Sequence, residues 1–89
     1  MTEAEIREKV WTFLAESFLY MRPDFRVEPD ESLLRAGVID SLGVMEVIGF
    51  VEDMSGIQVA EDEITEANFG TLNAIARYIA IKTSPAASS

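Results

Sequence analysis

The sequence contains no cysteine and no histidine, and these two absences exclude several classes of site at once. Without cysteine the chain has no disulfide, no thiolate nucleophile and no thiolate ligand for zinc. Without histidine it lacks Ser-His and Cys-His nucleophile pairs, HExxH metal sites and the usual imidazole acid or base. We therefore expect no metal site and no catalytic activity of its own, and a fold that is stabilised by packing alone.

Basic residues are scarce, with seven Lys and Arg against 16 Asp and Glu and a net charge of −9. Such a chain repels a phosphate backbone, so nucleic acid is not an expected partner. From Asp40 to Glu66 the sequence has no Lys or Arg. The acids of this stretch are Asp40, Glu46, Glu52, Asp53, Glu61, Asp62, Glu63 and Glu66. We expect them to form one acidic face that docks basic partners, and to have raised pKa values because their neighbours are also negative.

Long apolar runs are also missing, and the first residues lack the basic start and apolar stretch of a signal peptide. We therefore expect no membrane association and a cytoplasmic protein. The length of 89 residues and 48% apolar content are typical of one globular domain.

A first helix is predicted over residues 3 to 20. Thr2 and Glu5 have the spacing of a capping box, and the residue before Pro23 is disfavoured in a helix. Its predicted core stripe is Ile6, Val10, Phe13, Leu14 and Ser17, and the aromatic side chains Trp11, Phe13 and Phe18 are also expected in the core. Residues 21 to 39 then form a long loop, with a helical turn around 32 to 35. Its apolar residues Leu33, Leu34, Val38 and Ile39 are expected to anchor it.

A second helix is predicted from Asp40-Ser41 to Gly56, which is expected to end it. One side carries apolar residues at helical spacing, and another carries Glu46 and Asp53 with Glu52 beside them. Gly43 and Gly49 each cost about 1 kcal/mol relative to Ala, which suggests that something approaches the backbone closely there.

One or two helical turns are predicted over 61 to 66, followed by a last helix that Thr71 caps and Lys82 ends. The predicted fold is all-α: a small helical bundle of three main helices plus one short helix, with a long loop between helices one and two. We expect residues 1–82 to form the domain and residues 83–89 to be a disordered tail.

Ser41 is the candidate reactive group, a hydroxyl between Asp40 and Leu42 at the start of the acidic helix. Asp and Ser are preferred at helix starts, so a capping role alone explains the Asp-Ser pair. However, residues 33–43 (LLRAGVIDSLG) resemble the attachment region of acyl carrier proteins. Residues 46–48, 52–53, 56–59 and 74–79 resemble the later parts of the same family, so that the resemblance covers roughly residues 3 to 82.

This resemblance implies a free-standing, acyl-carrier-like protein. Ser41 would receive 4′-phosphopantetheine from coenzyme A, with Asp40 and Leu42 beside it, and the arm would hold biosynthetic intermediates as thioesters. Implied partners are a phosphopantetheinyl transferase, an acyl- or aminoacyl-loading enzyme, and downstream synthase or tailoring enzymes with basic docking surfaces. The residues implied in partner recognition are Leu42, Met45, Glu46, Glu52, Asp53, Val59 and Glu61. From the chain's own residues, Leu42 and Met45 are equally compatible with an ordinary core position.

The run Asn68-Phe69-Gly70-Thr71-Leu72 is similar to discrete carriers of specialised-metabolite pathways that accept an amino acid or a small oxygenated acyl unit. We expect the carrier to act as a monomer. Two alternatives follow from composition: an acidic helical adaptor without a prosthetic group, in which Ser41 only caps a helix, and a calcium-binding helical protein. The second rests on carboxylate number alone, because the ordered oxygen spacing of an EF-hand loop is missing.

Overall fold

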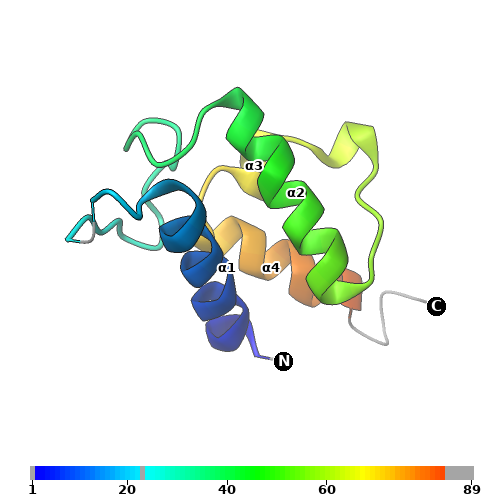
Figure 1. Ribbon diagram of the computed structural model, residues 1–89. Helices are drawn as coiled ribbons and strands as arrows, with labels where there is room; N and C mark the ends of the chain where they lie inside the picture. The colour runs from blue at the N-terminus through cyan, green and yellow to red at the C-terminus, as the bar shows by residue number, and fades with distance from the viewer. Residues whose placement is uncertain (1, 23, 84–89) are drawn as a thin grey trace.

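Four α-helices and one 3-10 turn make up the regular structure of residues 2–22 and 24–83, which are the residues that the computed structural model describes. They are α1 (Glu3–Phe18), α2 (Ser41–Ser55), η1 (Glu61–Glu63), α3 (Glu66–Phe69) and α4 (Leu72–Thr83). Helices α1 and α2 both pack against α4, and α3 is a short helix that leads into α4 (Figure 1). The predicted all-α bundle is confirmed, although the short helical segment is divided between η1 and α3.

Local side-chain caps fix the ends of the helices where the sequence predicts them. At the start of α1, the Glu5 backbone N–H donates to Thr2 Oγ1 at 3.1 Å, and the Thr2 N–H donates to Glu5 Oε1 at 3.0 Å. Gly56 ends α2 with a φ of 74°, a conformation that glycine adopts without steric cost. Thr71 Oγ1 accepts from the Ala74 N–H at 3.0 Å and so caps α4.

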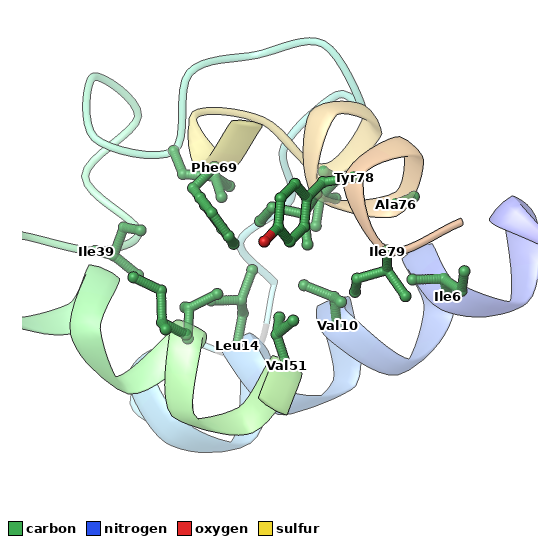
Figure 2. Close-up of a cluster of buried hydrophobic side chains, with 14 of the residues drawn as sticks. Ile6, Val10, Leu14, Ile39, Val51, Phe69, Ala76, Tyr78 and Ile79 are labelled. Carbon is green, nitrogen blue, oxygen red and sulfur yellow. The ribbon is translucent and has the colours of Figure 1, made fainter. Parts of the chain in front are cut away.

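The hydrophobic core lies between α1, α2 and α4, and Figure 2 shows its side chains converging from these helices. Its largest fully buried members are Ile6, Val10, Leu14, Leu33, Val47, Val51, Ile75 and Ile79. Burial of each such side chain contributes about 1.5 to 3 kcal/mol to the free energy of unfolding. In a chain without disulfides, this burial is the main stabilising contribution.

The end of α1 differs from the prediction. The helix stops at Phe18 rather than at residue 20, and Ser17, expected in the core stripe, is exposed. Leu19 instead enters the core because the chain turns away from the helix there. Trp11, Phe13 and Phe18 are half-buried at the edge of the core, and Phe13 stacks on Phe50 with ring centroids 4.4 Å apart.

The long connection from residue 19 to residue 40 is anchored to the C-terminal part of the fold by backbone hydrogen bonds. The Leu33 N–H donates to Gly70 O at 2.9 Å, and the Asn73 N–H donates to Pro29 O at 3.0 Å. Leu33 is buried, whereas Leu34, expected to be another anchor, is 43% exposed. The predicted helical turn at 32 to 35 is confirmed as a single turn, in which the Ala36 N–H donates to Ser32 O at 2.9 Å, and the connection leads directly into the start of α2 (Figure 1).

At the C-terminal end, Thr83 belongs to α4, so the predicted tail begins one residue too early. Residues 84–89 of that tail lie outside the described residues. Across the described part of the chain, no helix is long and apolar enough to cross a membrane.

Candidate functional site

The start of α2 is capped by Asp40, and this leaves Ser41 as the first residue of the helix. Asp40 has an extended backbone, with φ −112° and ψ −170°, and its Oδ1 accepts from the Gly43 N–H at 2.8 Å. Its carbonyl oxygen accepts from the Val44 N–H at 3.0 Å. The capping role that the sequence left open between Asp and Ser therefore falls to Asp40.

Ser41 is exposed, and its hydroxyl makes no hydrogen bond to any residue that the structure describes. The backbone N–H groups of Ser41 and Leu42 also have no acceptor among the described residues, as is usual for the first turn of a helix. An accessible hydroxyl thus lies beside free amide donors at the positive end of the helix dipole. This arrangement suits a covalently attached phosphate group.

Apolar side chains flank Ser41 on the surface. Leu42 is 76% exposed and Met45 is 56% exposed, so neither belongs to the core. Exposed large apolar side chains beside a reactive group are typical of a surface that contacts another protein.

The two glycines of α2 have different environments. A Cβ on Gly43 would lie 3.0 Å from the Ile39 Cβ and 3.3 Å from the Phe18 Cε1, so Gly43 allows the first turn of α2 to approach the α1 end of the bundle. Gly49 has nothing within 4 Å of the same position. The expected close approach to the backbone is confirmed at Gly43 and wrong at Gly49.

The acidic residues predicted for partner recognition divide into two groups. Glu46, Asp53 and Glu61 are exposed. Glu52 is half-buried, and its Oε2 accepts from the Val59 N–H at 2.9 Å, which ties the end of α2 to the following segment. Val59 is itself half-buried and packs against the core. Glu52 and Val59 therefore have structural contacts, because the chain folds back on α2 after Gly56.

Glu63 also departs from the expected acidic face, because it is paired. Its Oε2 lies 2.9 Å from Lys82 Nζ, and its Oε1 accepts from the Tyr78 hydroxyl at 2.9 Å and from the Ala60 N–H at 3.1 Å. Lys82 above all, then the Ala60 and Tyr78 donors, lower the pKa of Glu63, opposite to the expected rise. Burial, together with Glu63, raises the pKa of Tyr78 to about 12.

One residue near Ser41 was missed by the sequence reasoning, which used Arg22 only as a helix end. Arg22 lines a surface groove of about 530 Å³ together with Asp40 and Leu42, the two neighbours of Ser41. Its Nη2 donates to Gly37 O at 3.1 Å. No sequence pattern links Arg22 to Ser41. The two residues come close to the same groove only because the long connection folds back toward the start of α2.

The described residues include no group of three or more acidic side chains arranged to hold a metal ion.

Two comparisons with known proteins bear on this site. The family model for the phosphopantetheine attachment site matches residues 14–79. The chain is also similar to a D-alanyl carrier protein of Streptococcus suis, with 32% identity over 71 residues that cover 80% of this chain and 86% of the relative. The family match includes all of α2 with Ser41 at its start, together with the end of α1 and most of α4.

Proposed function

The chain belongs to the phosphopantetheine-attachment family of carrier proteins, whose members bear 4′-phosphopantetheine covalently on a serine, and on this premise we propose that Ser41 is the attachment residue. Carriers of this family are not enzymes and act with a phosphopantetheinyl transferase and a loading enzyme. The observation that supports the proposal is that two neighbouring residues at the start of α2 have different roles. Asp40 caps the helix, and the Ser41 hydroxyl is left accessible and without a described hydrogen-bond partner.

The attachment step uses Ser41 as the nucleophile. Its Oγ forms a bond to the β-phosphorus of coenzyme A. The bond between that phosphorus and the bridging oxygen breaks, and adenosine 3′,5′-bisphosphate leaves with this oxygen. The hydroxyl proton of Ser41 is transferred to a base. We assign the base that takes this proton to the transferase, because the chain has no His or Cys and the neighbouring Asp40 carboxylate already caps the helix. When attached, the arm supplies the thiol that holds an acyl group as a thioester.

The residues at the start of α2 fit such a group. The Ser41 and Leu42 amides are donors without a described acceptor, and the positive end of the helix dipole stabilises a nearby anion by about 0.3 to 1 kcal/mol at an exposed position. The Asp40 Oδ1 accepts from the Gly43 N–H, so this amide is not available to the phosphate.

Intact-mass measurement tests the attachment. The purified chain is incubated with coenzyme A, Mg²⁺ and a promiscuous phosphopantetheinyl transferase. We expect the mass of one arm to be added to the wild type and to Ser17→Ala, an exposed serine on α1, but not to Ser41→Ala. No gain in the folded wild type, or an undiminished gain in Ser41→Ala, would contradict the proposal, and the first result would favour an acidic adaptor.

We propose that Leu42, Met45, Glu46, Asp53 and Glu61 form the docking surface for the partner enzymes. The exposed apolar pair next to Ser41 and the exposed carboxylates along α2 and η1 support an interface with a small apolar centre and an acidic periphery. A basic surface on the partner complements it and speeds encounter at low salt. The structural contacts of Glu52 and Val59 make them poorer candidates than the sequence implied.

We propose an aminoacyl unit as the cargo, and the similarity to a D-alanyl carrier protein supports it. A carrier of a specialised-metabolite pathway, as expected from the sequence, is the second proposal. It rests on the run from Asn68 to Leu72, in which Phe69 packs on Tyr78 and Gly70 O holds Leu33, so these residues also have a structural role.

The cargo is tested by incubating the arm-bearing protein with ATP, one amino acid and a D-alanine-activating ligase. We expect a mass gain with D-alanine that hydroxylamine releases, as for a thioester, and no gain in Ser41→Ala. Efficient loading only by enzymes that transfer small oxygenated acyl units would instead favour the specialised pathway.

A further inference from the structure

A surface groove of about 530 Å³ opens beside Ser41, between the end of α1, the long connection and the first turns of α2. Its lining residues are Phe18, Arg22, Gly37, Val38, Ile39, Asp40, Leu42 and Glu46. Asp40 and Leu42 precede and follow Ser41, so a group attached to the Ser41 hydroxyl starts at the edge of this groove. The proposed attachment alone does not require such a groove.

Arg22 is the one basic side chain among these lining residues, and its position is fixed by contacts to the rest of the connection. Its Nη2 donates to Gly37 O at 3.1 Å, and its Cζ lies 4.5 Å from the centre of the Phe25 ring. Its backbone is also held, because its N–H donates to Leu19 O at 2.8 Å. A guanidinium has five N–H donors in a planar fork, so one bond to Gly37 leaves donors for an anion.

The two acids that line the groove form no ion pair with Arg22 in the described part of the chain. The Asp40 carboxylate accepts from the Gly43 N–H at the base of α2. Glu46 is exposed one helical turn further along α2. Neither carboxylate of the groove is therefore within ion-pair distance of the guanidinium.

We propose that this groove binds the first part of the attached arm, with the Arg22 guanidinium donating hydrogen bonds to its phosphodiester. The inference rests on the proposed attachment at Ser41. Arg forms strong, directional bonds with phosphate oxygens, and a tethered phosphate has a high effective concentration at the groove. The free amides of Ser41 and Leu42 lie at the same edge and supply further donors. Arg22 thus positions the arm and does not take part in the attachment chemistry.

Nuclear magnetic resonance of the protein with and without the arm tests this binding directly. We expect the Arg22 side-chain Nε–H signal to shift when the arm is attached and its guanidinium protons to exchange more slowly with water. The signal of Arg35, an exposed arginine in the long connection that does not line the groove, is the internal control and should stay unchanged. An unchanged Arg22 signal in a protein whose mass shows the attached arm would overturn the inference.

Variants give a second, independent readout. We expect Arg22→Gln to move the phosphorus-31 signal of the arm toward that of the same phosphodiester in the urea-unfolded protein, Arg22→Lys to move it less, and Arg35→Gln to leave it in place. The rise in melting midpoint on attachment should be smaller in Arg22→Gln by about 2 to 4 °C, the effect of one exposed ion pair in a domain of this size. Failure of Ser41 to gain an arm would overturn the proposed function and this inference together. An attached arm with equal phosphorus signals in all variants would overturn this inference alone.

Discussion

Replacing each of the two glycines of α2 by alanine separates helix propensity from packing at the start of the helix. Both residues lie within one continuous helix, Ser41–Ser55, and both gain the same methyl group. At Gly43 the new Cβ would lie 3.0 Å from the Ile39 Cβ, a contact that neither side chain relieves by rotating, and 3.3 Å from the Phe18 ring. At Gly49 it meets nothing within 4 Å.

The expected free energies follow from these contacts. Alanine stabilises a helix interior by about 0.5 to 1 kcal/mol relative to glycine, so Gly49→Ala should raise the free energy of unfolding by that amount. Gly43→Ala has at most the same gain, and the packing clash costs about 1 to 3 kcal/mol. Gly43→Ala should therefore be about 1 kcal/mol less stable than the wild type, and the two variants should differ by about 1 to 3 kcal/mol.

Urea unfolding followed by circular dichroism measures both variants against the wild type. Thermal melts should show midpoints that move in opposite directions, since each kcal/mol corresponds to about 4 to 8 °C in a domain of this size. Displacement of the first turn should also slow addition of the arm to Ser41 in Gly43→Ala but not in Gly49→Ala. Equal stabilisation of both variants would refute the argument that the α2 start is closely packed on Ile39 and Phe18.

Three further predictions concern the surface charges and the Glu63 contacts. Glu46→Lys or Asp53→Lys should lower the rate of association with the transferase in stopped-flow measurements, while Glu31→Lys should not. If the association rate of the wild type stays constant up to about 0.5 M salt, where the screening length is roughly 4 Å, these acids do not steer binding. Tyr78→Phe should lower the urea-derived free energy of unfolding by about 0.5 to 1.5 kcal/mol, because one partly buried hydrogen bond to Glu63 is lost while the ring remains, and an unchanged value would contradict a stabilising bond. The pKa of Glu63 in the folded chain is below its ordinary value of 4.5, so the contribution of this carboxylate to stability is present above pH 4.5 and is lost as pH falls through the lower folded pKa. Between pH 5 and pH 3, the melting midpoint should therefore fall more in the wild type than in Glu63→Gln. Equal falls in the two proteins would refute this.

The local features of the fold could be predicted from sequence because their partners are three or four residues apart. The Thr2 and Glu5 capping box, the Asp40 cap on Gly43 and the turn at Gly56 are each complete within one helical turn. Such contacts form whenever the local backbone is helical, whatever lies around it. The helix positions and the start of α2 therefore followed from the residues themselves, and the proposal of Ser41 followed from the resemblance of the residues around it to acyl carrier proteins.

Helical spacing predicted burial less reliably at the edges of the core, because the local pattern does not show how much of a helix face other segments cover. Ser17 fits the helical pattern of buried positions but is exposed in the last turn of α1. In the loop, where apolar character alone predicted two anchors, Leu33 is buried and Leu34 is exposed. Leu42 and Met45 are each three residues from another apolar position of α2, but they lie on a different side of the helix from the buried Val51 and are exposed.

The sequence by itself determined the helices, their caps and the acidic, cysteine-free surface chemistry, because each depends on neighbouring residues or on composition. Only the tertiary structure decided which charges are available to a partner. Glu52 bonds to Val59, Glu63 to Lys82 and Tyr78, and Arg22 to Gly37, and these partners are 7 to 19 residues apart in the chain. A charge count cannot distinguish a paired carboxylate from an exposed one, since pairing depends on which segments the hydrophobic core brings side by side.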